Sequence, residues 1–138
     1  MTEGIHDQFV AKLTERAKVL RVGHALEEET QIGPVVDETQ LAQNLDYIEI
    51  AKHEGGKVVG GGTVICATDG YYMAPAVVTE TDNSMRINRE EVFGPIASVI
   101  RVKDYDEALA VANDTEFGLS AGICTTSLKH ASHFKANA

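Results

Sequence analysis

The sequence predicts an α/β fold, in which helices flank a layered and mostly parallel sheet. Apolar residues recur at helical spacing in several segments, and short runs rich in valine and isoleucine lie between them. Over residues 96–125 the expected order is strand, helix, strand, which favours a parallel pair joined by a right-handed crossover. The 138 residues have the length of one domain.

The amino-terminal half predicts two helices separated by a loop. The first is expected at residues 5–20, before Gly23, with an apolar face of Phe9, Leu13, Ala17 and Leu20. The loop reaches Val36 and turns at Gly33-Pro34. Asp37 can cap the second helix while Gln40 reaches back as in a capping box, and Gly55-Gly56 end that helix. Its expected buried stripe is Leu41, Leu45 and Ile48.

Four short strands are expected next, at residues 57–59, 64–67, 73–78 and 96–102. The glycines at positions 60–62 form a turn. A phosphate-binding loop is excluded because Val58, not Ser or Thr, follows Lys57. Asp104 can cap a further helix through Ala112, and residues 121–125 are expected to form a strand. Ser127 then begins a last helix, which carries Leu128, Ala131 and Phe134.

Composition excludes several classes of function. Twelve basic and twenty-one acidic residues give a net charge of −9, which disfavours binding to nucleic acid. No apolar run is long enough to span a membrane, and the first residues lack a signal peptide, so a cytoplasmic location is expected. Cys66 and Cys124 are predicted to be buried strand residues without a catalytic role or a disulfide. His130 and His133 have a metal-compatible spacing but no apparent third ligand, so no metal site is predicted.

The segment Glu90-Glu91-Val92-Phe93-Gly94-Pro95 is the strongest candidate for a binding site. In an extended chain, Glu91 and Phe93 point to the same face. The carboxylate offers acceptor oxygens and the ring offers a flat apolar surface, which together suit a sugar diol beside an aromatic ring. Taken alone, the six residues favour a structural interpretation, a charged start of a strand that carries a core phenylalanine before a tight turn.

These six residues resemble the Glu-Glu-(Ile/Val)-Phe-Gly-Pro signature of the aldehyde dehydrogenase superfamily. Three further segments resemble other motifs of that superfamily, in its order and at compatible spacing. They are Gln31-Ile32-Gly33-Pro34-Val35-Val36, Gly70-Tyr71-Tyr72-Met73-Ala74-Pro75-Ala76-Val77 and Asn113-Asp114-Thr115-Glu116-Phe117-Gly118-Leu119-Ser120-Ala121-Gly122-Ile123. The last has Phe117 where the superfamily more often has tyrosine.

The resemblance implies an enzyme that oxidises aldehydes to carboxylates with NAD or NADP. A cysteine thiolate attacks the aldehyde, hydride passes to the nicotinamide, and the resulting thioester is hydrolysed. By the same resemblance, Glu91 binds the nicotinamide-ribose hydroxyls, Phe93 packs near the nicotinamide ring, and Glu90 is a structural or solvent-facing residue. The catalytic cysteine and the general-base glutamate correspond to no residue of this chain. Residues 1–138 are therefore expected to be an internal part of the catalytic domain that is inactive alone.

The resemblance also extends to substrate and assembly. Residues 83–89 and 122–129 are similar to bacterial α-ketoglutarate semialdehyde (2,5-dioxovalerate) dehydrogenases, which implies a semialdehyde of a dicarboxylate as substrate. Superfamily members assemble as dimers or tetramers, so a homo-oligomer is expected. The alternative is a non-enzymatic remnant that acts as an oligomerisation or interaction module, with exposed apolar surface as its docking site.

Overall fold

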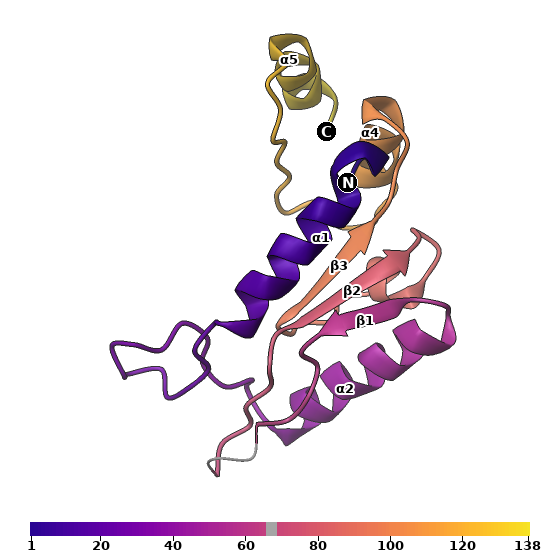
Figure 1. Ribbon diagram of the computed structural model, residues 1–138. Helices are drawn as coiled ribbons and strands as arrows, with labels where there is room; N and C mark the ends of the chain where they lie inside the picture. The colour runs from indigo at the N-terminus through magenta and orange to yellow at the C-terminus, as the bar shows by residue number, and fades with distance from the viewer. Residues whose placement is uncertain (66–68) are drawn as a thin grey trace.

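The computed structural model describes residues 1–65 and 69–138 (Figure 1). Its elements in chain order are α1 (Glu3–Lys18), α2 (Glu38–His53), β1 (Lys57–Gly60), β2 (Ala76–Thr81), α3 (Arg86–Arg89), β3 (Ile96–Ile100), α4 (Tyr105–Asn113) and α5 (Leu128–Asn137). The predicted α/β class with helices flanking a sheet is confirmed.

The sheet is mixed, with the strand order β1-β2-β3. The central strand β2 runs parallel to β3 and antiparallel to β1. The antiparallel pair arises because no crossover helix joins β1 to β2. Instead the chain turns at Gly61 and Gly62, whose φ values are 63° and 77°, and Val64 bridges Met73 in antiparallel fashion. The predicted glycine turn is confirmed, whereas Cys66 and Ala67 of the predicted strand at 64–67 lie outside the described residues.

The core lies on both faces of β2, between α1 and α2 (Figure 1). On the α2 side, Ala76 packs with Ile48, and Val78 packs with Ala51. Because side chains alternate along a strand, Val77 and Thr79 point toward the opposite face, where Thr79 contacts His6 of α1. Full burial of each valine contributes about 1.5–3 kcal/mol, so this strand anchors the whole layer arrangement.

Helix α1 forms where it is predicted, but it buries a different face. The buried side chains are His6, Val10, Thr14 and Ala17, and only Ala17 belongs to the predicted set. The predicted face is wrong because of close contacts with the sheet. A Cβ on Gly60 would lie only 3.0 Å from Thr14, so α1 approaches β1 too closely there for a large side chain. Phe9, a member of the predicted face, is 37% exposed.

A chain of polar contacts fixes α1 against the end of β3. The ring of His6 lies 3.0 Å from Asp7 Oδ1 through Nδ1 and 3.3 Å from Thr79 Oγ1 through Nε2. Arg101 donates to the same Asp7 oxygen at 2.6 Å. The contacts with His6 and Arg101 lower the pKa of Asp7. The buried histidine is thus satisfied at both ring nitrogens.

The prediction of a strand at residues 121–125 is wrong. A strand needs a partner, and residues 121–125 pair with none in the described structure. The edge of β3 at Ile100–Val102 is covered by Met1–Glu3 instead. The Met1 amino group donates to the Ile100 carbonyl at 2.7 Å, and the Val102 and Glu3 amides complete the pairing at 2.9 and 2.8 Å. The parallel strand–helix–strand unit therefore does not form, and Cys124 is exposed rather than buried in a strand.

The carboxyl-terminal helices begin at the predicted caps. Asp104 Oδ1 accepts from the Glu107 amide at 3.0 Å, and Ser127 Oγ accepts from the His130 amide at 3.2 Å. Helix α5 packs on α4 through Tyr105, whose ring is stacked on His130 with centroids 4.2 Å apart. The Tyr105 hydroxyl lies 2.8 Å from His133 Nδ1. Both histidines thus contact Tyr105.

Candidate functional site

The candidate site is the connection between α3 and β3, residues 90–95. Helix α3 ends at Arg89, and the next residue, Glu90, has an extended backbone at φ −112° and ψ 152°. Phe93 then has φ 57°, in the left-handed region that disfavours residues with a side chain. Gly94 and Pro95 return the chain to β3. Residues 85–95 are therefore partly helical and sharply turned at Phe93.

Glu91 and Phe93 line one hollow of about 340 Å³ at this turn. The Phe93 side chain is 73% exposed, and Glu91 is exposed as well. The Glu91 carboxylate accepts no hydrogen bond from any other described residue. An unpaired carboxylate and an uncovered ring therefore border the same space, as the sequence predicts. The predicted reason is wrong, however, because the left-handed turn at Phe93 breaks the simple alternation of an extended strand.

Glu90, by contrast, is held by two side chains. Arg86 donates to its carboxylate through Nε at 2.8 Å and Nη2 at 2.9 Å, and the Tyr47 hydroxyl donates at 2.5 Å. These donors favour the charged form and lower the pKa of Glu90 to about 2. The two adjacent glutamates therefore differ in their contacts: the Glu90 carboxylate is held by Arg86 and Tyr47, and the Glu91 carboxylate faces solvent.

A second hollow, of about 620 Å³, also borders the turn at Phe93. Its walls are Ile32–Val36, Gln40 and Phe93–Pro95. The Val35 amide donates to the Tyr71 carbonyl at 2.9 Å. Three of the four segments that carry the resemblance, around residues 31–36, 70–77 and 90–95, are thus neighbours in space although they are far apart in the sequence.

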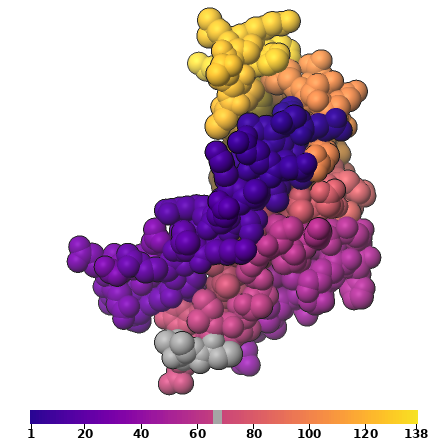
Figure 2. Space-filling model, viewed as in Figure 1, coloured from indigo at the N-terminus to yellow at the C-terminus, as the bar shows by residue number. Residues whose placement is uncertain are grey.

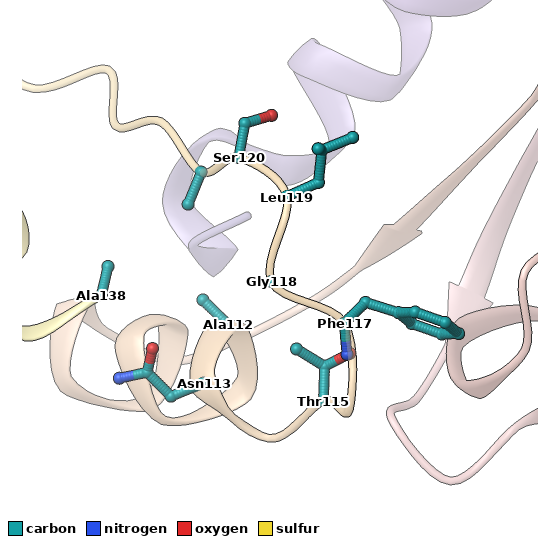
Figure 3. A pocket seen from close by; sticks show the side chains of 9 residues that line it. Ala112, Asn113, Thr115, Phe117, Gly118, Leu119, Ser120 and Ala138 are labelled. Carbon is teal, nitrogen blue, oxygen red and sulfur yellow. The ribbon is translucent and has the colours of Figure 1, made fainter.

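The fourth segment lies around another hollow, of about 560 Å³, at the end of α4 (Figure 3). The walls are Ala112, Asn113, Thr115, Phe117–Ala121 and Ala138, so no charged side chain borders it. The Phe117 ring points away from Ala112 and Ala138. Asp114 links this segment to α3 through contacts with Arg89 and Asn83. The hollow lacks groups for acid–base chemistry, and its segment supports the α3 end of the candidate site.

Metal-ligating groups do not cluster in the described part of the chain. Nowhere in residues 1–65 and 69–138 do three or more His, Cys, Asp or Glu residues gather closely enough to hold a metal ion. None of the helices described there is long and apolar enough to cross a membrane.

The space-filling view in Figure 2 shows α1 lying across the molecule with α5 extending beyond it.

Sequence reasoning missed the residues that support the turn. Gln40 Nε2 donates to the Val92 carbonyl at 3.0 Å, and Tyr47 donates to Glu90 across 43 positions of sequence. The predicted return of the Gln40 side chain toward Asp37 is not found, although Asp37 does cap the helix through the Gln40 amide at 2.8 Å. The available signal was a row of polar residues at helical spacing in α2, at positions 40, 43, 44 and 47.

The mixed sheet with its flanking helices matches the fold of aldehyde dehydrogenase structures. The chain belongs to the aldehyde dehydrogenase family, which it matches over residues 1–138. A solved structure of betaine aldehyde dehydrogenase from Staphylococcus aureus in complex with NAD+ superposes with a TM-score of 0.94 and 31% identity. That superposition covers 99% of this chain and 28% of the other.

Two relatives are more similar in sequence. The α-ketoglutarate semialdehyde dehydrogenase of Haloferax volcanii is 46% identical over 135 residues, covering 96% of this chain and 28% of that protein. The betaine aldehyde dehydrogenase of Mesorhizobium japonicum is 44% identical over 131 residues, covering 93% of this chain and 27% of that protein. The chain thus spans little more than a quarter of the length of these relatives.

Proposed function

We propose that this chain is the part of an NAD(P)-dependent aldehyde dehydrogenase that positions the nicotinamide ribose. The whole enzyme would oxidise an aldehyde to a carboxylate through a cysteine thioester. The observation that carries the proposal is the unpaired Glu91 carboxylate, which shares a hollow with the exposed Phe93 ring. The similarity to an NAD+-bound dehydrogenase structure supports the same assignment.

The residues present suit a nicotinamide riboside. A vicinal diol offers two donors, and a carboxylate with two free oxygens can accept from both, which fixes the sugar at two points. The Phe93 ring is an apolar surface that a flat heterocycle can cover. Holding Phe93 at φ 57° costs about 1–2 kcal/mol, a strain of the kind found at functional sites.

Each residue then has a limited role. When bound, the nicotinamide supplies the hydride acceptor. Glu91 orients the ribose and thereby aims the ring, while Phe93 excludes water from one side of it. The proposal assigns the nucleophilic cysteine and the general-base glutamate to parts of the enzyme other than these 138 residues. Cys124 is exposed in a segment without secondary structure, and it is not proposed as the nucleophile.

Substitution of Glu91 by glutamine in the complete enzyme tests the proposal. Hydride transfer requires reacting atoms held within about 3–3.5 Å, so loss of one acceptor oxygen should slow single-turnover hydride transfer far more than it weakens cofactor binding. The matched control is Glu49→Gln, which removes a charge from the exposed Glu49–Lys52 pair on α2. Equal hydride-transfer rates in Glu91→Gln and the parent would refute the proposal.

We further propose that the substrate is a semialdehyde of a dicarboxylate, as the name of the Haloferax relative suggests. The test is the ratio of kcat/KM for α-ketoglutarate semialdehyde to that for betaine aldehyde. Because the betaine aldehyde dehydrogenase is almost as similar in this segment, a preference for the cationic betaine aldehyde would overturn the substrate assignment while leaving the reaction class intact.

Assembly into a homo-oligomer is also a proposal. Leu119 and Leu128 are 98% and 81% exposed, and apolar side chains of this kind favour a covered surface. The same exposure favours the second candidate, a non-enzymatic interaction module. Light scattering on the complete enzyme tests the first: a monomer would refute it. The module is tested by turnover, because an active complete enzyme excludes a purely non-enzymatic role.

A further inference from the structure

Helix α2 contacts the rest of the molecule through two different faces. Ile48 and Ala51 pack on the sheet, as expected for an amphipathic helix. A second row consists of polar residues at the spacing i, i+3, i+4, i+7, and we call it the polar face of α2. Its members are Gln40, Gln43, Asn44 and Tyr47. Asn44 is completely buried, and the other three are partly buried, so this row points inward rather than to solvent.

Every member of the polar face contacts residues 90–94. Gln40 Nε2 and Gln43 Nε2 both point at the Val92 carbonyl, at 3.0 and 3.4 Å. The Tyr47 hydroxyl donates to Glu90 at 2.5 Å. A Cβ on Gly94 would lie 2.4 Å from the Asn44 amide nitrogen, so Gly94 rests directly on that side chain. Gln40 Nε2 also donates to Asn44 Oδ1 at 2.8 Å, which ties two members of the row together.

A second set of contacts holds Glu90 from the side of α3. The Arg86 guanidinium donates twice to its carboxylate and lies 5.7 Å from the centroid of the Tyr47 ring. Glu54, at the end of α2, accepts from the Arg86 amide at 3.0 Å. Arg86, Glu90 and Tyr47 therefore form one unit in which a planar, two-point ion pair is closed by a hydroxyl.

The polar face forms no hydrogen bond with Glu91 or Phe93 among the described residues, whereas it holds Glu90, Val92 and Gly94. Their neighbours on both sides are anchored: Glu90 through its carboxylate, Val92 through its carbonyl, and Gly94 through close packing. Anchoring alternate residues fixes the direction of the free side chains between them, since the backbone has few remaining soft torsions.

We propose that the polar face of α2 is the positioning element for the ribose-binding carboxylate of Glu91 and the ring of Phe93, with Gln40 and Tyr47 as its principal positioning residues. The inference rests on the proposed function of Glu91. None of the four residues touches the cofactor; they act through residues 90, 92 and 94. Loss of their hydrogen bonds should misplace Glu91 by a fraction of an ångström to about 1 Å, a displacement that can slow a transfer reaction roughly a hundredfold.

The test uses the complete enzyme with the substitutions Gln40→Glu and Tyr47→Phe. Gln40→Glu keeps size and helix propensity but turns an acceptor toward the Val92 carbonyl, and Tyr47→Phe removes only the hydroxyl. The control is Glu49→Gln, the converse isosteric exchange, at an exposed position of the same helix. Circular dichroism and thermal unfolding verify folding. Tyr47→Phe keeps the ring under Arg86, so it remains informative if Gln40→Glu fails to fold.

The decisive measurements are single-turnover hydride transfer, NAD+ affinity, and the primary isotope effect on kcat with an aldehyde deuterated at the carbonyl carbon. The expected result is hydride transfer slowed roughly tenfold or more in Gln40→Glu and severalfold in Tyr47→Phe, with NAD+ affinity changed less than about threefold and the isotope effect increased. A merely structural loss lowers the active fraction and leaves the isotope effect unchanged. That outcome would overturn the inference.

Glu91→Gln is measured in parallel to separate the two proposals. If Glu91→Gln slows hydride transfer but Gln40→Glu and Tyr47→Phe behave like Glu49→Gln, the proposed function stands and the positioning role is refuted. If Glu91→Gln itself has no effect on hydride transfer, the proposed function fails, and the positioning role fails with it.

Discussion

Replacing Gly94 by alanine tests how tightly the turn rests on α2. The added Cβ would meet three atoms of Asn44: Nδ2 at 2.4 Å, and Cγ and Oδ1 at 2.5 Å. Ordinary van der Waals contact begins near 3.4 Å, so one group must move by about 1 Å. Asn44 is fully buried and holds a hydrogen bond from Gln40, so we expect the turn, not the amide, to move.

The displacement should affect both stability and hydride transfer. Overpacking of this kind costs about 1–3 kcal/mol of unfolding free energy. A misplacement of about 1 Å can cost roughly a hundredfold in rate. At 1.36 kcal/mol per factor of ten, this corresponds to about 2.7 kcal/mol of transition-state stabilisation. The two assays are urea unfolding of the chain and single-turnover hydride transfer in the complete enzyme.

A double-mutant cycle tests whether Gly94 rests directly on Asn44. Asn44→Ala removes all three atoms that the new methyl group meets, so the double variant should be more stable than the sum of the single effects by about 0.5–3 kcal/mol. Gly118→Ala is the control, because a Cβ there has no atom within 4 Å. Additive effects of Gly94→Ala and Asn44→Ala, within about 0.5 kcal/mol, would show that Gly94 does not rest on Asn44.

Three further predictions concern stability. The pKa of Glu90 is lowered to about 2 from 4.5, so the stability that its charged form contributes is present above about pH 4.5 and is lost as pH falls toward 2. Unfolding midpoints of Glu90→Gln should therefore depend less on pH across this window than those of the parent. Equal pH dependence in the two proteins would contradict the Arg86 and Tyr47 contacts. Asp37→Ala should destabilise the chain by about 1 kcal/mol in urea unfolding, whereas Asp37→Asn, which keeps an acceptor for the Gln40 amide, should cost much less. Gly61→Ala should lower the free energy of unfolding by at least about 2 kcal/mol, because its Cβ would lie 1.7 Å from the Pro75 carbonyl oxygen and its φ is 63°. The control Gly122→Ala, whose Cβ has no atom within 4 Å, should be close to neutral. Similar losses in the two variants would contradict this packing.

Local signals in the sequence predicted α1, α2, α4 and α5, but not α3. Asp37, Asp104 and Ser127 each cap the helix that follows them, because a side-chain oxygen and an amide three residues on form a self-contained unit. The strand at 121–125 could not be judged in this way, because a strand forms only where the fold places a partner beside it, and these residues pair with no strand in the described structure. The face of α1 likewise depends on how closely Gly60 allows β1 to approach.

The candidate site likewise combines features that the local sequence indicates with features that depend on the rest of the fold. Glu91 and Phe93 were found from their chemistry and from resemblance, and the structure brings them to one hollow. Tyr47 and Glu90 are 43 positions apart in the sequence, so their hydrogen bond cannot be predicted from either segment alone. Polar residues at helical spacing indicate a helix face, but only the fold shows which loop that face contacts.

The contact between the first residues and the end of β3 has a consequence for folding during synthesis. Met1, which lies just before α1, pairs with Ile100 at a separation of 99 positions, and α1 itself packs on β1 and β2. Ribosomes add about 5–20 residues per second, so roughly 4–17 s separate completion of α1 from completion of Val102. A helix of 16 residues is marginal by itself in water, and its buried side chains lack their partners in β1 and β2 until those strands have been made within that interval. Translation speed through the middle of the chain therefore sets how long this helix is open to chaperones and to misassociation.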